Sequence, residues 1–139
     1  MIFRLASRAY GIEVGAVREI IPFRGATRLP DAPHFVAGLI NVRGTIVTVL
    51  DLGARLDGVS SARADGSVIL VERGAKLVGA LVDEVIDVRQ LPEAELELAV
   101  SDVAGGVARA FGQSGDEVIA LLDIGDIISQ VLVQPEESR

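Results

Sequence analysis

The sequence predicts a mostly β protein with short strands and very little helix. Apolar and polar residues alternate in many short stretches rich in β-branched residues, such as TIVTVL (45–50) and SVILVE (67–72). Such alternation is typical of half-buried strands, and it occurs in about nine or ten segments. In addition, VTVLDLG (47–53) and IALLDIG (119–125) both run from a strand into Leu-Asp-aliphatic-Gly. Together these patterns predict two related β-units packed as a pair of small barrels.

The strands are expected in a regular order along the chain. They are YGIEV (10–14), TIVTVL (45–50), SVILVE (67–72), KLVGALVDEVIDV (76–88), GVARAF (106–111) and DEVIALLD (116–123). In the longest stretch, Gly79 stands where a bend or bulge would fall. Asp83, Glu84 and Asp87 in the same stretch are expected to lie on a solvated strand face. GQSG (112–115) is expected to form the hairpin turn between the last two strands.

Short helices are expected in three places, after Pro33, Asp51 and Asp123. They are FVAGLI (35–40), LGARL (52–56) and IGDIISQVL (124–132). Asp51 and Asp123 precede the second and third helix, each at the position of an N-cap. Because a strand followed by an Asp cap is a common local arrangement, local structure explains the internal similarity as well as duplication does. We expect residues 1–139 to form a single domain whose polar end, residues 134–139, is disordered.

Composition excludes several classes of function. The chain has no cysteine and only one histidine, His34, so it contains neither a disulfide nor a His-based zinc motif. A net charge of −7 and an aromatic content of 4% argue against binding to nucleic acid. No stretch approaches the roughly 18 apolar residues of a membrane span, and the N-terminus has no signal-peptide features. We therefore expect a soluble protein that needs no metal or cofactor.

One pair of residues could support enzyme chemistry. Asp51 and Asp123 follow equivalent strands, and two such carboxylates could share a proton in a catalytic dyad. Aspartic proteases have Thr or Ser after the aspartate, whereas Leu52 and Ile124 stand there in this chain. A hydrolase that uses the two aspartates is therefore the weaker interpretation, and helix capping is the stronger one.

Arg43 is the unusual charge of the sequence. It lies within GLINVRGTIVTVLDLG (38–53), among apolar residues. A charge in this setting is expected to be partly buried and paired, because an unpaired buried charge is very costly. The alternative is that Arg43 lies at the edge of a surface that another molecule binds.

Five stretches match a known pattern in order. They are YGIEVGAVREII (10–21), LPDAPHFVAGLINVRGTIVTVLDLGARL (29–56), VILVE (68–72), VGALVDEVIDV (78–88) and GDEVIALLDIGDII (115–128). This series resembles the CheW-like domain of bacterial chemotaxis coupling proteins. The resemblance implies two SH3-like five-stranded β-barrels over a shared hydrophobic seam, with short helices and a C-terminal helix.

The same resemblance implies a function without enzyme activity. Members of the family are cytoplasmic adaptors at membrane-associated receptor arrays. They connect the cytoplasmic tip of a methyl-accepting chemoreceptor to the regulatory domain of the histidine kinase CheA, and other CheW-like proteins are further possible partners. Small β-barrels suit such a role, since exposed strands and apolar grooves pair readily with other proteins.

Individual residues carry expectations from this resemblance. Val17, Gly38 and Arg43 match receptor-binding positions, near a groove between the barrels that would accept an apolar helix tip. Glu19 and Ile20 match positions on the kinase-facing surface of the first barrel. We predict that Arg43 pairs with Glu19, so that the groove and the kinase-facing surface are oriented relative to each other.

The second barrel and the departures from the family pattern add two expectations. Phe111 would supply an apolar contact on the second barrel. Thr48 stands where a proline is common, and Gly53 replaces a frequent basic residue. These departures leave open an accessory docking protein of a motility, pili or developmental pathway, which would bind receptors without coupling a kinase.

Overall fold

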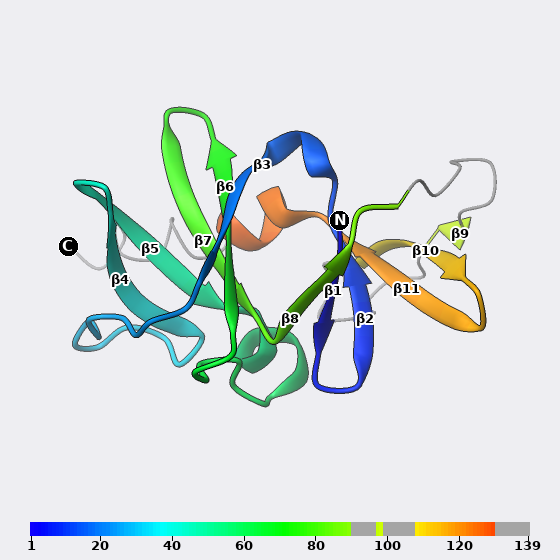
Figure 1. The fold of residues 1–139 in the computed structure, drawn as a ribbon, viewed down its shortest axis with the longest axis horizontal. Helices are drawn as coiled ribbons and strands as arrows, with labels where there is room; N and C mark the ends of the chain where they lie inside the picture. The colour runs from blue at the N-terminus through cyan, green and yellow to red at the C-terminus, as the bar shows by residue number, and fades with distance from the viewer. Residues whose placement is uncertain (90–96, 99–107, 130–139) are drawn as a thin grey trace.

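The computed structural model describes residues 1–89, 97–98 and 108–129, and in these residues the fold is mostly β (Figure 1). The strands are β1 (Ile2–Leu5), β2 (Arg8–Gly11), β3 (Val17–Pro22), β4 (Val36–Val42), β5 (Thr45–Asp51), β6 (Ser67–Arg73), β7 (Lys76–Val82), β8 (Glu84–Asp87), β9 (Glu97–Leu98), β10 (Ala108–Ser114) and β11 (Glu117–Leu122). Short helical segments are η1 (Val14–Ala16), η2 (Gly53–Asp57) and a helix over 124–129. The mostly β prediction is confirmed, and the predicted disordered tail, 134–139, lies outside the described residues.

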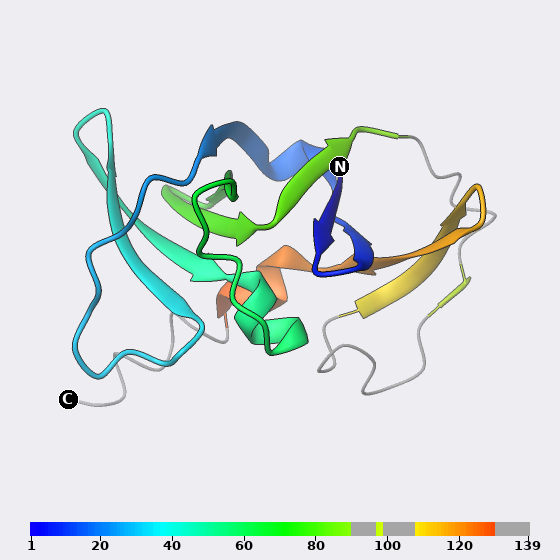
Figure 2. The same cartoon turned by 60° about the horizontal axis from the view of Figure 1, so that its bottom comes forward.

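The strands form two sheets that lie side by side (Figure 2). One has the order β8-β1-β2-β11-β10-β9, and the other has the order β3-β6-β7-β5-β4. The first sheet therefore combines both ends of the described chain, whereas the second uses its middle. β11 pairs in parallel with β2, and β5 pairs in parallel with β7. The two strands of the internal similarity thus occupy equivalent places, which is consistent with a pair of small barrels.

A shared hydrophobic core joins the two sheets. Its buried members include Phe3 and Tyr10 from the six-stranded sheet, and Leu50 and Ile69 from the five-stranded sheet. Ile127, in the helix after β11, packs in the same cluster. Phe3 stacks on Tyr10 with the ring centroids 6.1 Å apart. The predicted hydrophobic seam is therefore present between the sheets.

The helix predicted for residues 35–40 is wrong, because most of this segment forms β4. β4 pairs with β5 in a hairpin, from Val36 opposite Leu50 to Val42 opposite Thr45. A short apolar run fits a buried helix or a strand equally well by periodicity alone. Here pairing with β5 decides between them.

The bend predicted at Gly79 occurs instead at Asp83. β7 ends at Val82 in the five-stranded sheet, and β8 begins at Glu84 in the six-stranded sheet. Gly79 lies within β7, where a Cβ atom would lie only 2.8 Å from Val68 Cγ1. The expected solvated position of Asp83 is also wrong, since its side chain is 11% exposed. The chain therefore crosses between the two sheets at a nearly buried carboxylate.

Candidate functional site

Arg43 lies at the tip of the β4–β5 hairpin. Val42 pairs with Thr45, so Arg43 and Gly44 form a two-residue turn, with φ values of 49° and 92°. Positive φ at both central residues is the mark of a type I′ turn, whose twist matches that of the flanking strands. The side-chain oxygen of Asn41 accepts the Gly44 amide at 2.8 Å. The Arg43 side chain is consequently 71% exposed, and the expectation of partial burial is wrong.

The structure brings Arg43 and Glu19 together. Arg43 Nη2 donates to Glu19 Oε1 at 2.5 Å, and Nη1 donates to Oε2 at 3.2 Å. Glu19 lies on β3, one edge of the five-stranded sheet, and the Arg43 hairpin begins with β4, the other edge. The ion pair therefore connects the two edges of this sheet. A two-point contact of this kind fixes the orientation of both side chains.

The pair also changes the acidity of Glu19. The hydrogen bonds from the Arg43 guanidinium lower the pKa of Glu19, and partial desolvation opposes this effect without cancelling it. Because the pKa is lower in the folded state, the stabilising contribution of the pair is present above the unfolded pKa, about 4.3. It is lost as the pH falls through the folded pKa.

We expect Arg43→Ala to raise the pKa of Glu19 toward its ordinary value. The reason is that the largest stabilising contact of the carboxylate would be removed. A side-chain carboxyl NMR titration measures this, with Arg24→Ala as the control. A Glu19 titration that is the same in wild type and Arg43→Ala would contradict the observed pairing.

Ile20 faces away from this ion pair. Exposure alternates along β3, so that Glu19 and Ile20 point to opposite sides of the strand. Ile20 is 42% exposed, which is unusual for a large apolar side chain on a strand with an apolar core behind it. Val17, on the side of Glu19, is half-buried and packs against the shared core. β3 thus presents an apolar contact on one side and a charged contact on the other.

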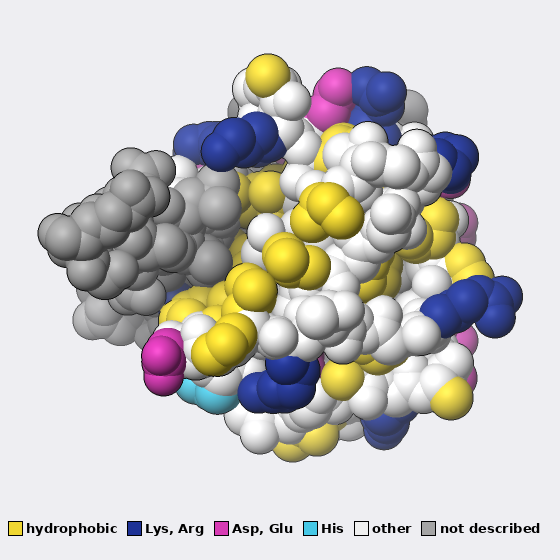
Figure 3. All heavy atoms as spheres, turned by 90° about the vertical axis from the view of Figure 1, so that its left-hand side faces the viewer, with side chains coloured by type: hydrophobic (Ala, Val, Ile, Leu, Met, Phe, Trp, Pro, Cys, Tyr) yellow, Lys and Arg dark blue, Asp and Glu magenta, His cyan; other side chains and the backbone are white. Residues whose placement is uncertain are grey.

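An open hollow lies between β3 and β4, on the same sheet as the ion pair. Its lining is mixed: apolar side chains such as Ile21, Phe23 and Leu39 alternate with polar residues such as Arg24 and Asn41. Figure 3 views the molecule from the side of β4 and β5, where apolar side chains gather among several basic ones. A hollow between two edge strands can accept side chains of a partner.

Gly38 supports this hollow from inside β4. It is buried and has a φ of 139°. The neighbouring residue Leu39 exchanges two backbone hydrogen bonds with Thr27, at 2.8 and 2.9 Å. A Cβ atom on Gly38 would lie 2.3 Å from the Thr27 carbonyl oxygen. Gly38 therefore shapes the surface by allowing the 23–27 segment to lie directly on β4.

Phe111 is not part of this surface. It lies on β10 of the six-stranded sheet, opposite Ala120 of β11, and is half-buried. Phe111 therefore lies on a different sheet from Glu19 and Ile20, and its role as a contact on the second barrel stays a prediction.

Asp51 and Asp123 both accept hydrogen bonds from the helical turns that follow them. Asp51 Oδ1 accepts the Ala54 amide at 3.1 Å, and Asp123 Oδ1 accepts the Asp126 amide at 3.2 Å. Asp123 also lies 3.4 Å from an Arg109 guanidinium nitrogen. The two carboxylates thus have separate partners, and no contact described for either joins them in a dyad.

Asp51 has further contacts that the sequence did not indicate. It is 3% exposed, its Oδ1 accepts the Ser61 amide at 2.9 Å, and its Oδ2 accepts the Ser60 hydroxyl at 2.5 Å. No local pattern marks Ser60 and Ser61 as partners of a strand-end aspartate. Within the described ranges, no group of three His, Asp or Glu side chains could hold a metal ion, and no helix is long and apolar enough to cross a membrane.

Comparison with known proteins identifies similar chains. Residues 1–132 match the family model of the CheW-like domain. The chain is 31% identical over 138 residues to the chemotaxis protein CheW of Klebsiella aerogenes, covering 93% of this chain and 80% of that protein. It is 33% identical over 134 residues to the chemotaxis protein CheW of Thermotoga maritima, covering 95% and 88%. The crystal structure of the scaffolding protein TtCheW from Thermoanaerobacter tengcongensis superposes with a TM-score of 0.79 at 28% identity, covering 88% of this chain and 82% of that one.

Proposed function

The chain belongs to the CheW-like family of scaffold proteins, and from that premise we propose that it is a non-enzymatic adaptor. It couples the cytoplasmic tip of a methyl-accepting chemoreceptor to the regulatory domain of the histidine kinase CheA. The observation that carries this proposal is the ion pair of Arg43 with Glu19. The resemblance assigns Arg43 to the receptor and Glu19 to the kinase, so the pair links a residue of each predicted surface.

The receptor is proposed to bind at the β4–β5 hairpin. Arg43 is exposed there, and the hollow between β3 and β4 lies on the same sheet, with Ile21, Phe23 and Leu39 in its lining. An apolar helix tip would place side chains in the hollow, while Arg43 would orient polar groups at its rim. Gly38 contributes through the shape of β4, and Val17 through its support of β3.

The kinase is proposed to bind on the Ile20 side of β3. Of the two residues matched to the kinase-facing surface, Ile20 then makes the direct contact, and Glu19 acts through its ion pair with Arg43. Ile20 supplies the apolar anchor, since it is the exposed large aliphatic side chain next to Glu19. Complete burial of a large aliphatic side chain in an interface is worth about 1.5–3 kcal/mol. Binding at two sides of one strand would place receptor and kinase next to each other on a single small protein.

Two single variants test this assignment. We expect Arg43→Ala to weaken binding to a receptor cytoplasmic fragment by about tenfold or more, and Ile20→Ala to weaken binding to the kinase regulatory domain similarly. Isothermal titration calorimetry with each purified partner measures both affinities. Circular dichroism of each variant verifies that the fold is retained.

Matched controls lie on the six-stranded sheet. Arg4 forms a two-point ion pair with Glu117, at 3.0 and 3.3 Å, and Val118 is an exposed aliphatic residue of β11. Arg4→Ala and Val118→Ala should leave both affinities unchanged. Binding to the receptor alone would indicate an accessory docking protein, and binding to neither partner would refute the proposed function.

A further inference from the structure

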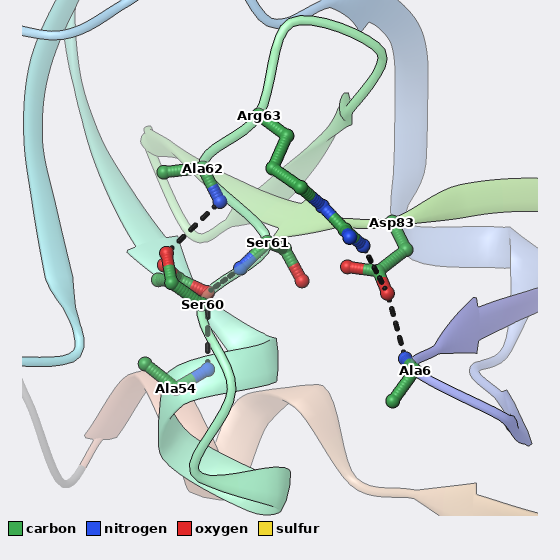
Figure 4. Close-up of polar contacts among 8 residues, drawn as sticks. Ala6, Ala54, Ser60, Ser61, Ala62, Arg63 and Asp83 are labelled. Atoms are coloured by element: carbon green, nitrogen blue, oxygen red, sulfur yellow. Dashed lines mark hydrogen bonds and ion pairs between the residues drawn. The ribbon is translucent and has the colours of Figure 1, made fainter.

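Asp83 lies at the point where the chain crosses between the two sheets, and it has contacts with segments on both sides (Figure 4). Its carboxylate oxygen Oδ2 accepts the amide of Ala6 at 2.6 Å, and its own amide donates to the Arg4 carbonyl at 3.1 Å. Ala6 lies in the tight β1–β2 turn and has a positive φ of 54°. Both the side chain and the backbone of Asp83 are therefore bound to one hairpin of the six-stranded sheet.

Arg63 reaches the same carboxylate from the other sheet. Its Nη2 lies 2.7 Å from Asp83 Oδ2. Arg63 belongs to the segment between η2 and β6, which is anchored to the five-stranded sheet through the contacts of Ser60 and Ser61 with Asp51. Figure 4 shows this sequence of contacts, from the end of β5 through the 60–63 segment to Asp83. We call Ala6, Arg63 and Asp83 the joint.

The joint is closely packed on its inner side. Ser61 is fully buried, and a Cβ atom on Gly53 would lie 2.4 Å from its hydroxyl oxygen. Figure 4 shows the Ser61 side chain turned toward Asp83. Ser61 Oγ and Asp83 Oδ1 are both buried. The carboxylate is held by Arg63 and Ala6 through Oδ2, and the Ser61 hydroxyl lies beside it.

The charge state of Asp83 agrees with this role. Burial raises the pKa of the carboxyl group. The neighbouring Ser61 hydroxyl, the Ala6 amide and the Arg63 guanidinium lower the pKa by more, so it lies below its ordinary value. Asp83 is therefore ionised at neutral pH and can bind both the amide and the guanidinium.

We propose that the ion pair of Arg63 with Asp83 fixes the angle between the two sheets, and that this angle positions their partner-binding surfaces for simultaneous binding. The second part rests on the proposed adaptor function. The Arg43 and Ile20 surfaces lie on the five-stranded sheet, whereas Phe111 lies on the six-stranded sheet. A receptor or kinase bound singly to the five-stranded sheet does not depend on the angle. A three-component assembly that also contacts Phe111 on the six-stranded sheet does, because misalignment lowers the effective concentration of that added contact.

The angle can be measured directly with spin labels. The chain has no cysteine, so Ala75→Cys on the β6–β7 turn and Val118→Cys on β11 give one labelled site on each sheet. Pulsed electron paramagnetic resonance should show a single narrow distance distribution in the otherwise unchanged protein. We expect Arg63→Ala and Asp83→Asn to broaden or shift that distribution, and Arg63→Lys to restore it in part.

Arg18→Ala is the matched control. Arg18 forms an exposed ion pair with Glu72 within the five-stranded sheet, and its side chain is 58% exposed against 55% for Arg63. Its removal should leave the distance distribution unchanged. If Arg63→Ala is folded and its distance distribution is the same as that of the wild type, the proposal of a fixed angle is overturned.

The binding consequence has its own test. Arg63→Ala should keep its separate affinities for the receptor fragment and the kinase regulatory domain, while the yield of the three-component complex falls at least about threefold. An unchanged yield would overturn the positioning role. If wild-type protein binds neither partner, the adaptor function fails, but the distance measurement still decides whether the joint fixes the angle.

Discussion

Gly38→Ala is expected to destabilise the protein by about 4 kcal/mol, because it combines backbone strain with overpacking. The φ of 139° at Gly38 lies in a region that residues with a side chain rarely adopt. In addition, the new methyl group would lie 2.3 Å from the Thr27 carbonyl oxygen and 2.7 Å from its carbonyl carbon. These are backbone atoms, so relief requires movement of the segment that covers β4.

Two other glycines separate the contribution of backbone strain from that of overpacking. Gly44 has a φ of 92° but nothing within 4 Å of an added Cβ, so Gly44→Ala should cost only about 1–2 kcal/mol. Gly15 has open space and no positive φ, and Gly15→Ala should change stability by less than about 0.5 kcal/mol. Urea unfolding measures all three. A Gly38→Ala variant as stable as Gly15→Ala would contradict the close approach of Thr27 to β4.

This prediction changes how a binding defect at Gly38 is interpreted. Gly38 matches a receptor-binding position, but its backbone is buried in β4. A Gly38 variant that fails to bind a receptor would therefore fail through the shape of the hollow or through the fold. Arg43, which is exposed, gives the cleaner test of direct contact.

Phe3→Ala is expected to destabilise the protein by about 4 kcal/mol, and the whole protein should unfold in a single transition. Phe3 is completely buried in the core cluster that residues of both sheets share. Removing its ring leaves a cavity in the core that both sheets share, so both sheets should lose stability together. Val118→Ala, at a 59% exposed position of the six-stranded sheet, should change stability by less than about 0.5 kcal/mol.

The number of transitions is the decisive observation for Phe3→Ala. Circular dichroism of the sheets and NMR signals from each sheet should lose intensity at the same urea concentration. If the six-stranded sheet unfolds first and the five-stranded sheet persists, the two sheets do not share one cooperative core.

The mostly β fold could be predicted because strand periodicity is a local property. Alternation in 45–50 and 67–72 depends on which face of each strand meets the core, and both segments form strands. The segment 35–40 could not be assigned in the same way, since its short apolar run fits two structures. Its partner β5 provides the missing information, and that pairing is not encoded in the segment itself.

Within the candidate site, Arg43 likewise had one feature that the sequence could predict and one that it could not. Its pairing with Glu19 could be predicted from the need for a counter-charge and from the family resemblance. Its exposure could not, because Arg-Gly is a less obvious turn signal than Asn-Gly or Asp-Gly. Gly44, which stands between two segments rich in apolar and β-branched residues, is the feature that would have indicated a hairpin.

Asp83 had no local signal at all. Its neighbours in sequence suggested a solvated strand face, whereas its contacts come from Ala6 and Arg63, both far away along the chain. Burial of a charge depends on such distant partners. For this reason the joint between the sheets became visible only in three dimensions.

A three-component pull-down shows whether this chain joins a receptor to a kinase. An immobilised receptor cytoplasmic fragment is incubated with the CheA regulatory domain, with and without the purified protein. We expect the kinase domain to be retained only when the protein is present, and we expect Arg43→Ala, but not Arg4→Ala, to abolish retention. Retention of the kinase domain at the same level without the protein, or no retention with it, would contradict the proposed adaptor function.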